Sequence, residues 1–290
     1  YIARKDNIYT IKKEYLKEDY EKLGNKKNDL RIVWKNKKIG ILDEKSKKMI
    51  ETNYDNLFLL ENIILSQKNG KYGLIDKEGK EILETKYDKI KVLNKEKILL
   101  MLNKKIYIFQ INEQKIKELD VENIIKVDDK YILSQKNNLY GIIDFNGNII
   151  IPFEYKYLDL FSEELAVALN IKGRAGYIDK NNNFVTKEIY QYLSNLKDSR
   201  GIVIKNDKYG LIDSLGNEIL AIEYKNIFKI SRDRYGVTTN NGTFLIDKDG
   251  KKIGTNTYES LGKEVEGKIP IKKDGKYGVI NKNGNEIIKP

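Results

Sequence analysis

The apolar residues of this chain fall into short runs of about five, separated by turn residues and not by long polar stretches. In the clearest stretch three such runs follow one another, at 201–205, 209–213 and 218–222. Asn206-Asp207 is a hairpin turn pair between the first two. Asp213 begins the next turn with a side-chain acceptor, and Gly216 ends it with a residue that readily adopts φ > 0. Connections this short join antiparallel neighbours, so the pattern predicts three firm strands.

A further short apolar stretch precedes the first run in most copies of this pattern. Residues 124–127 are an example, followed by Asp128-Asp129 and by the run 131–133. We therefore expect each copy to form an antiparallel meander of three firm strands and one short strand.

The same pattern recurs along the whole chain. The segment Lys71-Tyr72-Gly73-Leu74-Ile75-Asp76-Lys77-Glu78-Gly79 has close copies at 140–147, 208–216 and 276–284. Weaker copies centre on Asp43, Asp179 and Asp247, and a degenerate one centres on Phe109. Successive copies are 33 to 35 residues apart.

A second column of residues has the same period. It consists of Tyr20, Tyr54, Tyr87, Val121, Tyr155, Tyr190, Tyr224 and Tyr258, each followed three residues later by Leu or Ile. Two columns with one period indicate a tandem repeat of about 34 residues. The length of 290 residues alone would favour two domains, and the repeat replaces that interpretation.

The repeat sets the domain organisation. We expect residues 24–290 to form one domain of about eight repeats, and residues 1–23 to be a diverged partial repeat or an N-terminal closing segment. Residues 8–23 also fit one face of a helix that ends at Gly24, although Tyr20 and Leu23 fall in the repeat column.

Small sheets that cannot bury their own apolar faces must stack on one another. The predicted fold class is therefore all-β, with tandem antiparallel meanders of about 34 residues. A β-propeller-like ring is favoured over an open β-solenoid or superhelix, because eight four-stranded units match the upper end of the usual blade number. In the repeat, the positions that follow that of Pro290 are those that Asp19 and Tyr20 hold near the start of the chain. This suits closure of a ring and equally suits a fragment of a longer array.

The recurring segment Lys-Tyr-Gly-Leu-Ile-Asp-x-x-Gly-x-x-Ile, followed by Tyr-Asp, resembles the bacterial WG (KWG) repeat family. The resemblance covers nearly the whole chain and is strongest at 71–90, 139–158, 208–227 and 276–290. Tyr72, Tyr140, Tyr209 and Tyr277 replace the tryptophan that names the family, and the single Trp34 lies outside that column. The resemblance implies a β-rich binding or interaction protein, often at bacterial surfaces. It supplies no catalytic residues.

Composition excludes several kinds of chemistry. The chain has no Cys and no His, so a Cys nucleophile, a Ser-His-Asp triad, a disulfide and a zinc site of the usual ligands are ruled out. Of 54 basic residues 48 are Lys, so the formal charge of +11 is a lysine-biased background and weak support for nucleic-acid binding. No apolar run reaches the length of a transmembrane helix.

The periodic Asp and Tyr residues have both structural and functional interpretations. Asp144, Asn146 and Asn148 resemble part of a calcium loop, but the twelfth position is Tyr155 and not the Glu of an EF-hand. We interpret these residues as turn formers. Eleven of the 20 Tyr lie in the two columns, and we expect them to pack on neighbouring repeats and not to stack on ligands. We expect no enzyme activity, no catalytic residue, no metal and no cofactor.

One group of residues is not shared by all the repeats. Arg200 and Arg234 occupy equivalent positions 34 residues apart, with Arg232 beside them, in the hairpin before the first firm strand. This hairpin is expected at the same rim as the Asp-x-x-Gly turns, and Arg174 at the opposite rim. We predict an anion-binding or acidic-partner-binding rim at Arg200, Arg232 and Arg234. The alternative is that they are ordinary solvated turn residues.

These observations predict a non-enzymatic binding or scaffold protein that mediates protein–protein interaction at a bacterial surface. The alternative is a carbohydrate-binding, lectin-like module, which would require exposed tyrosines outside the packing columns, such as Tyr131, Tyr157, Tyr177 or Tyr192. The chain opens Tyr1-Ile2 without an initiator Met, which suggests that a leader or a larger region has been removed. We expect an exported or surface protein, although a cytoplasmic location also fits. A protein partner is favoured over a carbohydrate, and nucleic acid is disfavoured.

Overall fold

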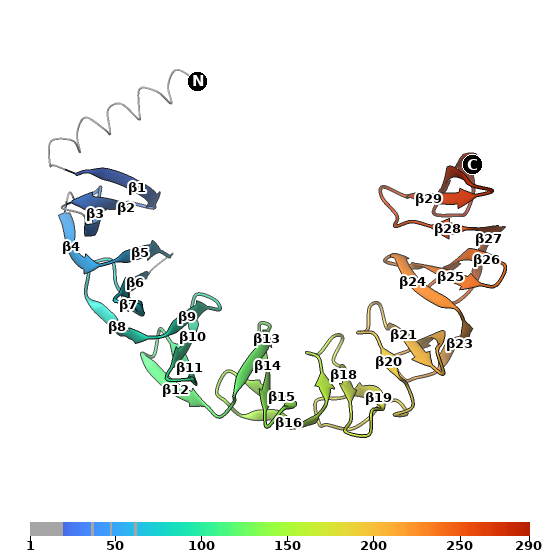
Figure 1. Ribbon diagram of the computed structural model, residues 1–290, viewed down its shortest axis with the longest axis horizontal. Helices are drawn as coiled ribbons and strands as arrows, with labels where there is room; N and C mark the ends of the chain where they lie inside the picture. The colour runs from blue at the N-terminus through green and yellow to red at the C-terminus, as the bar shows by residue number, and fades with distance from the viewer. Residues whose placement is uncertain (1–19, 36–37, 47, 61–62) are drawn as a thin grey trace, which may run out of the picture. The chain divides into compact units, whose positions relative to one another are not determined.

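The described residues of the repeats fold into eight separate antiparallel sheets. The computed structural model describes residues 20–290 apart from 36–37, 47 and 61–62, and every regular element among them is a β-strand (Figure 1). Seven sheets have four strands and one has three, each in sequence order. The predicted all-β class and the repeated four-stranded meander are confirmed. The expectation for residues 1–23 lies mostly outside the described residues.

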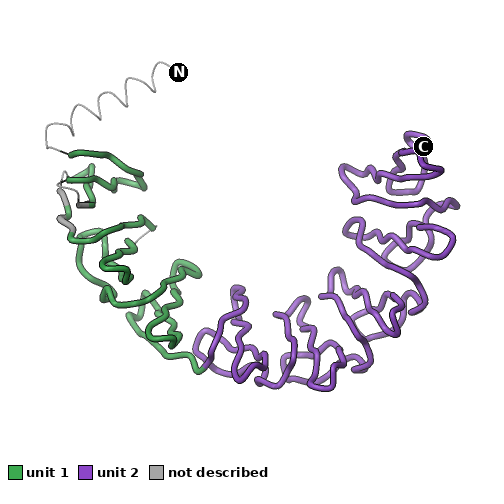
Figure 2. The backbone as a smooth tube through the Cα atoms, viewed as in Figure 1, with its two compact units in different colours: residues 1–120 green, residues 121–290 purple. Residues whose placement is uncertain are grey.

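The chain divides into two compact units, residues 1–120 and residues 121–290 (Figure 2). Unit 1 holds repeats 1 to 3, with the strands β1 (Lys22–Lys27), β2 (Leu30–Lys35), β3 (Lys38–Asp43), β4 (Lys48–Tyr54), β5 (Asn56–Leu59), β6 (Ile64–Lys68), β7 (Lys71–Ile75), β8 (Glu81–Tyr87), β9 (Lys89–Val92), β10 (Lys97–Leu102), β11 (Lys105–Gln110) and β12 (Lys115–Leu119).

Unit 2 holds repeats 4 to 8. Its strands are β13 (Asn123–Val127), β14 (Tyr131–Lys136), β15 (Leu139–Asp144), β16 (Ile149–Tyr155), β17 (Tyr157–Leu158), β18 (Ala166–Leu169), β19 (Ala175–Ile178), β20 (Tyr192–Leu193), β21 (Arg200–Lys205), β22 (Lys208–Asp213), β23 (Glu218–Tyr224), β24 (Asn226–Ser231), β25 (Arg234–Thr239), β26 (Gly242–Asp247), β27 (Lys252–Tyr258), β28 (Ser260–Leu261), β29 (Lys268–Lys273), β30 (Lys276–Asn281) and β31 (Glu286–Ile288).

The turns form as the sequence predicts. Asn206 and Asp207 both have positive φ, which is the two-residue type I′ hairpin that suits twisted strands. At the next turn Asp213 Oδ1 accepts from the backbone N–H groups of Leu215 and Asn217, both at 2.9 Å, and Gly216 has φ +86°. The interpretation of the Asp column as turn formers is confirmed here.

Within each unit the hydrophobic cores lie between neighbouring sheets, because each small sheet buries its face against the next one of that unit. Between repeats 4 and 5, for example, Ile142 and Ile151 pack with Leu158 and Ile178. The anchor Tyr155 is buried in this cluster, and its hydroxyl donates to Asn182 Oδ1 in the turn of the next repeat at 2.6 Å. The predicted packing role is thus observed in the anchor column, where Tyr20, Tyr87, Tyr155, Tyr190 and Tyr258 are buried, whereas Tyr277 of the motif column is exposed.

The motif glycine permits a close approach between strands. A Cβ atom on Gly141 would lie 2.7 Å from Cδ1 of Phe153, a contact too short for any side chain. Glycine within a strand commonly marks such an approach.

Repeat 5 departs from the predicted pattern, because its last strand is replaced by isolated bridges. Thr186 explains the difference: its hydroxyl oxygen accepts the backbone N–H of Tyr177 at 2.9 Å, in place of a backbone carbonyl of a regular ladder.

Candidate binding site

The hairpin between the first two strands and the Asp-x-x-Gly turn lie at the same end of each sheet in unit 2. The strand register shows this, because Arg200 pairs with Asp213 and Arg234 pairs with Asp247. We call this end the turn rim. Arg174 lies in the β18–β19 hairpin, at the other end of its sheet.

Arg200 and Arg234 contact the turn of the following repeat. Arg200 donates to the carbonyl oxygen of Lys248 at 2.8 Å and to Asp249 Oδ1 at 2.9 Å. Arg234 donates in the same way to the carbonyl oxygen of Lys282 at 3.2 Å. Both side chains are largely buried, with 17% and 16% exposed. Their equivalent positions therefore give equivalent contacts between repeats.

Arg232 has a different environment, because 87% of its side chain is exposed. Its Nε donates to Asp198 Oδ1 at 2.9 Å, and Lys229 Nζ lies 3.4 Å from the other carboxylate oxygen. These two cations lower the pKa of Asp198, with the hydrogen bond from Arg232 the larger cause. Of the three predicted rim arginines, Arg232 is the one whose guanidinium faces solvent, and the binding role stays a prediction.

Two acidic residues of the turn rim gain partners that the sequence did not reveal. Glu163 accepts the backbone N–H groups of Asp198 and Ser199 at 2.6 and 2.7 Å, and so holds the hairpin tip of the next repeat. Glu164 forms an ion pair with Lys180. A 35-residue separation from Glu163 to Asp198 is one repeat length, which is the only signal that could have indicated the contact.

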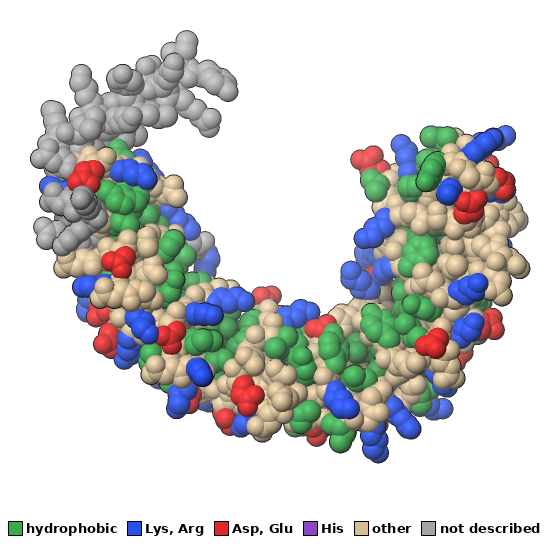
Figure 3. Space-filling model, viewed as in Figure 1, with side chains coloured by type: hydrophobic (Ala, Val, Ile, Leu, Met, Phe, Trp, Pro, Cys, Tyr) green, Lys and Arg blue, Asp and Glu red, His purple; other side chains and the backbone are tan. Residues whose placement is uncertain are grey.

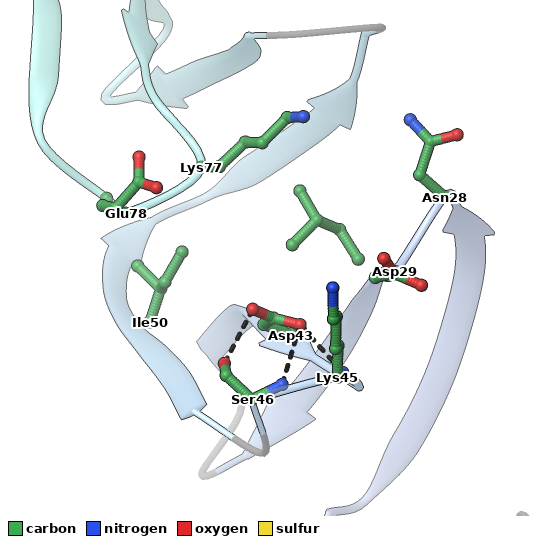
Figure 4. A pocket seen from close by; sticks show the side chains of 10 residues that line it. Asn28, Asp29, Asp43, Lys45, Ser46, Ile50, Lys77 and Glu78 are labelled. Carbon is green, nitrogen blue, oxygen red and sulfur yellow. Dashed lines mark hydrogen bonds between the residues drawn. The ribbon is translucent and has the colours of Figure 1, made fainter.

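A pocket of about 570 Å³ lies between turns of repeats 1 and 2 in unit 1 (Figure 4). Its carboxylate Asp43 is used inside its own turn, where it accepts from the hydroxyl of Ser46 at 2.7 Å and from two backbone N–H groups. The Ser46 hydroxyl is the main reason that the pKa of Asp43 is lowered. Lys45 and Lys77 also line this gap, so its charge is mixed.

A second cavity, of about 480 Å³, lies between repeats 5 and 6 in unit 2. We call it the tyrosine cavity. Its lining residues are Tyr157, Asp159, Val167, Leu169, Ala175, Gln191, Tyr192, Leu193 and Asn195. Its volume is in the range of ordinary small-ligand sites, which are mostly apolar with a few fixed polar groups.

Asp159 is the charged group of the tyrosine cavity. Its carboxylate accepts from Asn195 Nδ2 at 2.7 Å, from Lys126 Nζ at 2.9 Å and from the backbone N–H of Leu160 at 2.8 Å. Burial alone would raise the pKa of Asp159, but these three hydrogen bonds outweigh burial and lower it. The carboxylate therefore stays ionised and fixed in position.

The four tyrosines considered for carbohydrate binding occupy different environments. Tyr157 and Tyr192 are 46% and 52% exposed, and both line the tyrosine cavity. Tyr177 is fully buried, its hydroxyl donates to the carbonyl oxygen of Ser194 at 2.6 Å, and burial raises its pKa. Tyr131 is half-buried against the ring of Phe161.

Charged groups elsewhere do not gather into one patch on the visible face. Figure 3 shows basic side chains scattered among acidic and apolar ones. Within the part of the chain that the structure describes, no three carboxylates converge as a metal site would require. No helix among the described residues is long and apolar enough to cross a membrane.

Comparison with protein families identifies the repeat. The WG containing repeat matches residues 72–105, 140–170, 176–209, 209–242 and 277–290, which together make up half of the chain. The chain belongs to the WG repeat family. The resemblance drawn from the Lys-Tyr-Gly-Leu-Ile-Asp segments is confirmed.

Other comparisons add little about this WG repeat chain. No curated protein matches it. Among solved structures it is similar to the computationally designed Ika8 protein (14% identity, 91% of this chain and 96% of that chain, TM-score 0.36). It is also similar to a eukaryotic initiation factor (9%, 93% and 87%, TM-score 0.44) and to the C-terminal WD40 domain of Sif2 (13%, 87% and 92%, TM-score 0.32).

Proposed function

We propose that this WG repeat chain is a non-enzymatic protein-interaction module whose partner docks on the turn rim of unit 2. The observation that carries the proposal is a set of side chains on that rim that are largely exposed to solvent. Leu215 and Val265 are both 67% exposed, and Arg232 is more exposed still. Arg is enriched at protein interfaces, and the burial of exposed apolar side chains favours association.

The contrast with the periodic residues supports this proposal. Asp213 is bound within its own turn, and Arg200 and Arg234 hold the turns of following repeats. Leu215, Arg232 and Val265 lie in turns of repeats 6, 7 and 8, so a partner would extend across three repeats. An acidic partner suits Arg232.

The test uses the full chain immobilised on a resin and incubated with extract of the source organism. The rim variant is Leu215→Asp/Arg232→Glu/Val265→Asp. The control variant is Lys276→Glu/Tyr277→Asp at the start of β30, at the other end of its sheet, where Tyr277 is also exposed. We expect one protein to be retained by the wild type and the control and lost with the rim variant. Equal retention by the rim variant, or no specific retention by the wild type, would contradict the proposal.

A carbohydrate-binding module is the second candidate. The observation in its favour is that Tyr157 and Tyr192 are both exposed at the tyrosine cavity, as such a module requires. Specific glycan-array binding that Tyr192→Ala abolishes would place this candidate first.

Two further proposals concern the setting of the chain. We propose that it acts at a bacterial surface, which the family resemblance implies and which cell fractionation with a chain-specific antibody would test. We also propose that its eight small sheets close into a ring, since eight antiparallel sheets match the upper end of the usual blade number of propellers.

A further inference from the structure

The tyrosine cavity exists because repeat 5 lacks the aromatic residue of the repeat motif. In the neighbouring repeats Tyr140 pairs with the anchor Tyr155, and Tyr209 pairs with the anchor Tyr224. The same position in repeat 5 is Ala175, which forms a bridge with its own anchor Tyr190. A methyl group thus stands where the motif supplies a phenol ring.

The preceding repeat shows what that ring would contact. Tyr140 packs against Tyr157, with ring centroids 6.2 Å apart and planes at 48°. Counting 35 residues on from this pair gives Ala175 and Tyr192. Among the described residues no aromatic ring packs on Tyr192, and the cavity of about 480 Å³ lies beside it.

The tyrosines at the cavity mouth are a local feature of the chain. Tyr157 and Tyr192 follow their anchors by two residues. The same position in the other six repeats holds Lys22, Asn56, Lys89, Asn123, Asn226 and Ser260. Packing of the repeats therefore does not require an aromatic residue here, and its presence in two adjacent repeats needs another explanation.

The polar side of the cavity selects the chemistry of an occupant. The Asp159 carboxylate has about four lone-pair sites and uses three of them on Asn195, Lys126 and Leu160. It is 14% exposed, so one acceptor site remains for a donor inside the cavity. Because Lys126 already balances its charge, the site suits a neutral donor better than a cation.

We propose that the tyrosine cavity receives a tyrosine or tryptophan side chain of the partner protein, which packs against Tyr192 as Tyr140 packs against Tyr157 and donates its O–H or N–H to Asp159. The proposal rests on the proposed protein-interaction function and names the partner group that this site would bind. Val167, Leu169 and Leu193 supply the apolar wall for the ring. A saccharide would also use the tyrosines, but the group that repeat 5 lacks relative to its neighbours is an aromatic ring.

The test measures binding of N-acetyl-tyrosinamide and of p-cresol to the full chain by ligand-observed NMR. A ligand of this size and one stacking partner should give a saturable Kd on the order of 1 mM. Ala175→Tyr restores the motif ring and should abolish binding while the midpoint of thermal unfolding stays the same or rises. Tyr192→Ala, at an exposed position, should weaken binding by roughly tenfold. Tyr277→Ala, which removes an exposed motif tyrosine of repeat 8, should bind as the wild type does.

The proposal is overturned if the wild type shows no saturable binding or if both Ala175→Tyr and Tyr192→Ala bind as the wild type does. Tighter binding of methyl glycosides than of N-acetyl-tyrosinamide, lost in Tyr192→Ala, overturns it in favour of a carbohydrate site. The rim variant should still bind the probes. If the wild type binds no probe but retains a protein that the rim variant loses, the cavity proposal fails and the interaction function stands.

Discussion

Tyr177 and Gly201 form a matched pair of residues from adjacent repeats. Tyr177 is fully buried, and a Cβ atom on Gly201 would lie 1.9 Å from its hydroxyl oxygen and 3.0 Å from Cζ. The side chain of Tyr177 in repeat 5 thus fills the space that a side chain at position 201 of repeat 6 would need. We expect Gly201→Ala to lower the free energy of unfolding by about 2 kcal/mol, since the added methyl overpacks the core.

The double variant Gly201→Ala/Tyr177→Phe tests this explanation. Removal of the hydroxyl relieves the shortest contact, although Tyr177→Phe alone costs about 1 kcal/mol by leaving the carbonyl of Ser194 without its donor. Urea unfolding should therefore show the double variant to be more stable than the sum of the two single changes predicts. If the changes in the free energy of unfolding of the two single variants simply add, the hydroxyl of Tyr177 is not the cause of the destabilisation by Gly201→Ala.

The turn aspartates predict how stability depends on pH. Backbone N–H donation, first from Asn183, lowers the pKa of Asp179. At Asp213 burial raises the pKa, but hydrogen bonds from Asn217 and other backbone groups outweigh burial and lower it. Because both folded-state pKa values lie below the ordinary 3.8, their stabilising effect is complete above that pH and is lost as the pH falls through the folded-state values.

The variant Asp179→Asn/Asp213→Asn should remove part of this acid sensitivity. Asn281 occupies the same column in repeat 8 and accepts the same two backbone N–H groups, so Asn preserves the turn. We expect the wild type to be the more stable protein at pH 7 and the two proteins to converge below pH 3.8. If the curves of thermal midpoint against pH for the wild type and the variant are parallel, these two carboxylates are not the source of the acid sensitivity.

At the scale of elements, Glu163 connects the hairpin of repeat 5 to that of repeat 6. Its two oxygens hold the N–H groups of Asp198 and Ser199, both of which have positive φ in a tight turn. We expect Glu163→Ala to lower the free energy of unfolding by about 1–2 kcal/mol. Glu164→Ala is the matched control, because its ion pair with Lys180 is exposed and should change stability by less than about 0.5 kcal/mol. Equal effects in urea unfolding would refute the connecting role.

Two of the three rim arginines, Arg200 and Arg232, should have opposite effects on stability and on partner binding. Arg200→Ala removes the guanidinium that donates to the carbonyl oxygen of Lys248 and to the carboxylate of Asp249, and it should lower the free energy of unfolding by about 1–2 kcal/mol. Arg232→Ala removes an exposed side chain and should be nearly neutral in the same measurement. For partner retention we expect the reverse order, since Arg232 is the arginine that faces solvent. Loss of stability in Arg232→Ala would place it with the structural arginines.

The sequence predicts those features of the fold that are local or that recur in every repeat, and it misses those that belong to a single repeat. The Asp213 turn and the Asn206-Asp207 hairpin are local, so their residue types alone predicted them, and the period predicted the stacking of sheets. The tyrosine cavity was not predicted, because it results from what Ala175 lacks relative to Tyr140. The contacts of Arg200 were also missed, since solvated turn residues and residues that bind the next turn have the same sequence pattern.

At the scale of the whole molecule, the proposed ring predicts a compact particle in solution. A closed arrangement of 290 residues should have a radius of gyration of about 19 Å, which is the value for a compact chain of this length. An open superhelix of the same eight sheets places its first and last repeats far apart and must exceed that value clearly. Small-angle X-ray scattering of the full chain measures this difference, with the urea-unfolded chain at about 60 Å as the upper reference. A radius several ångströms above the compact value, unchanged on dilution, would replace the ring with an open array.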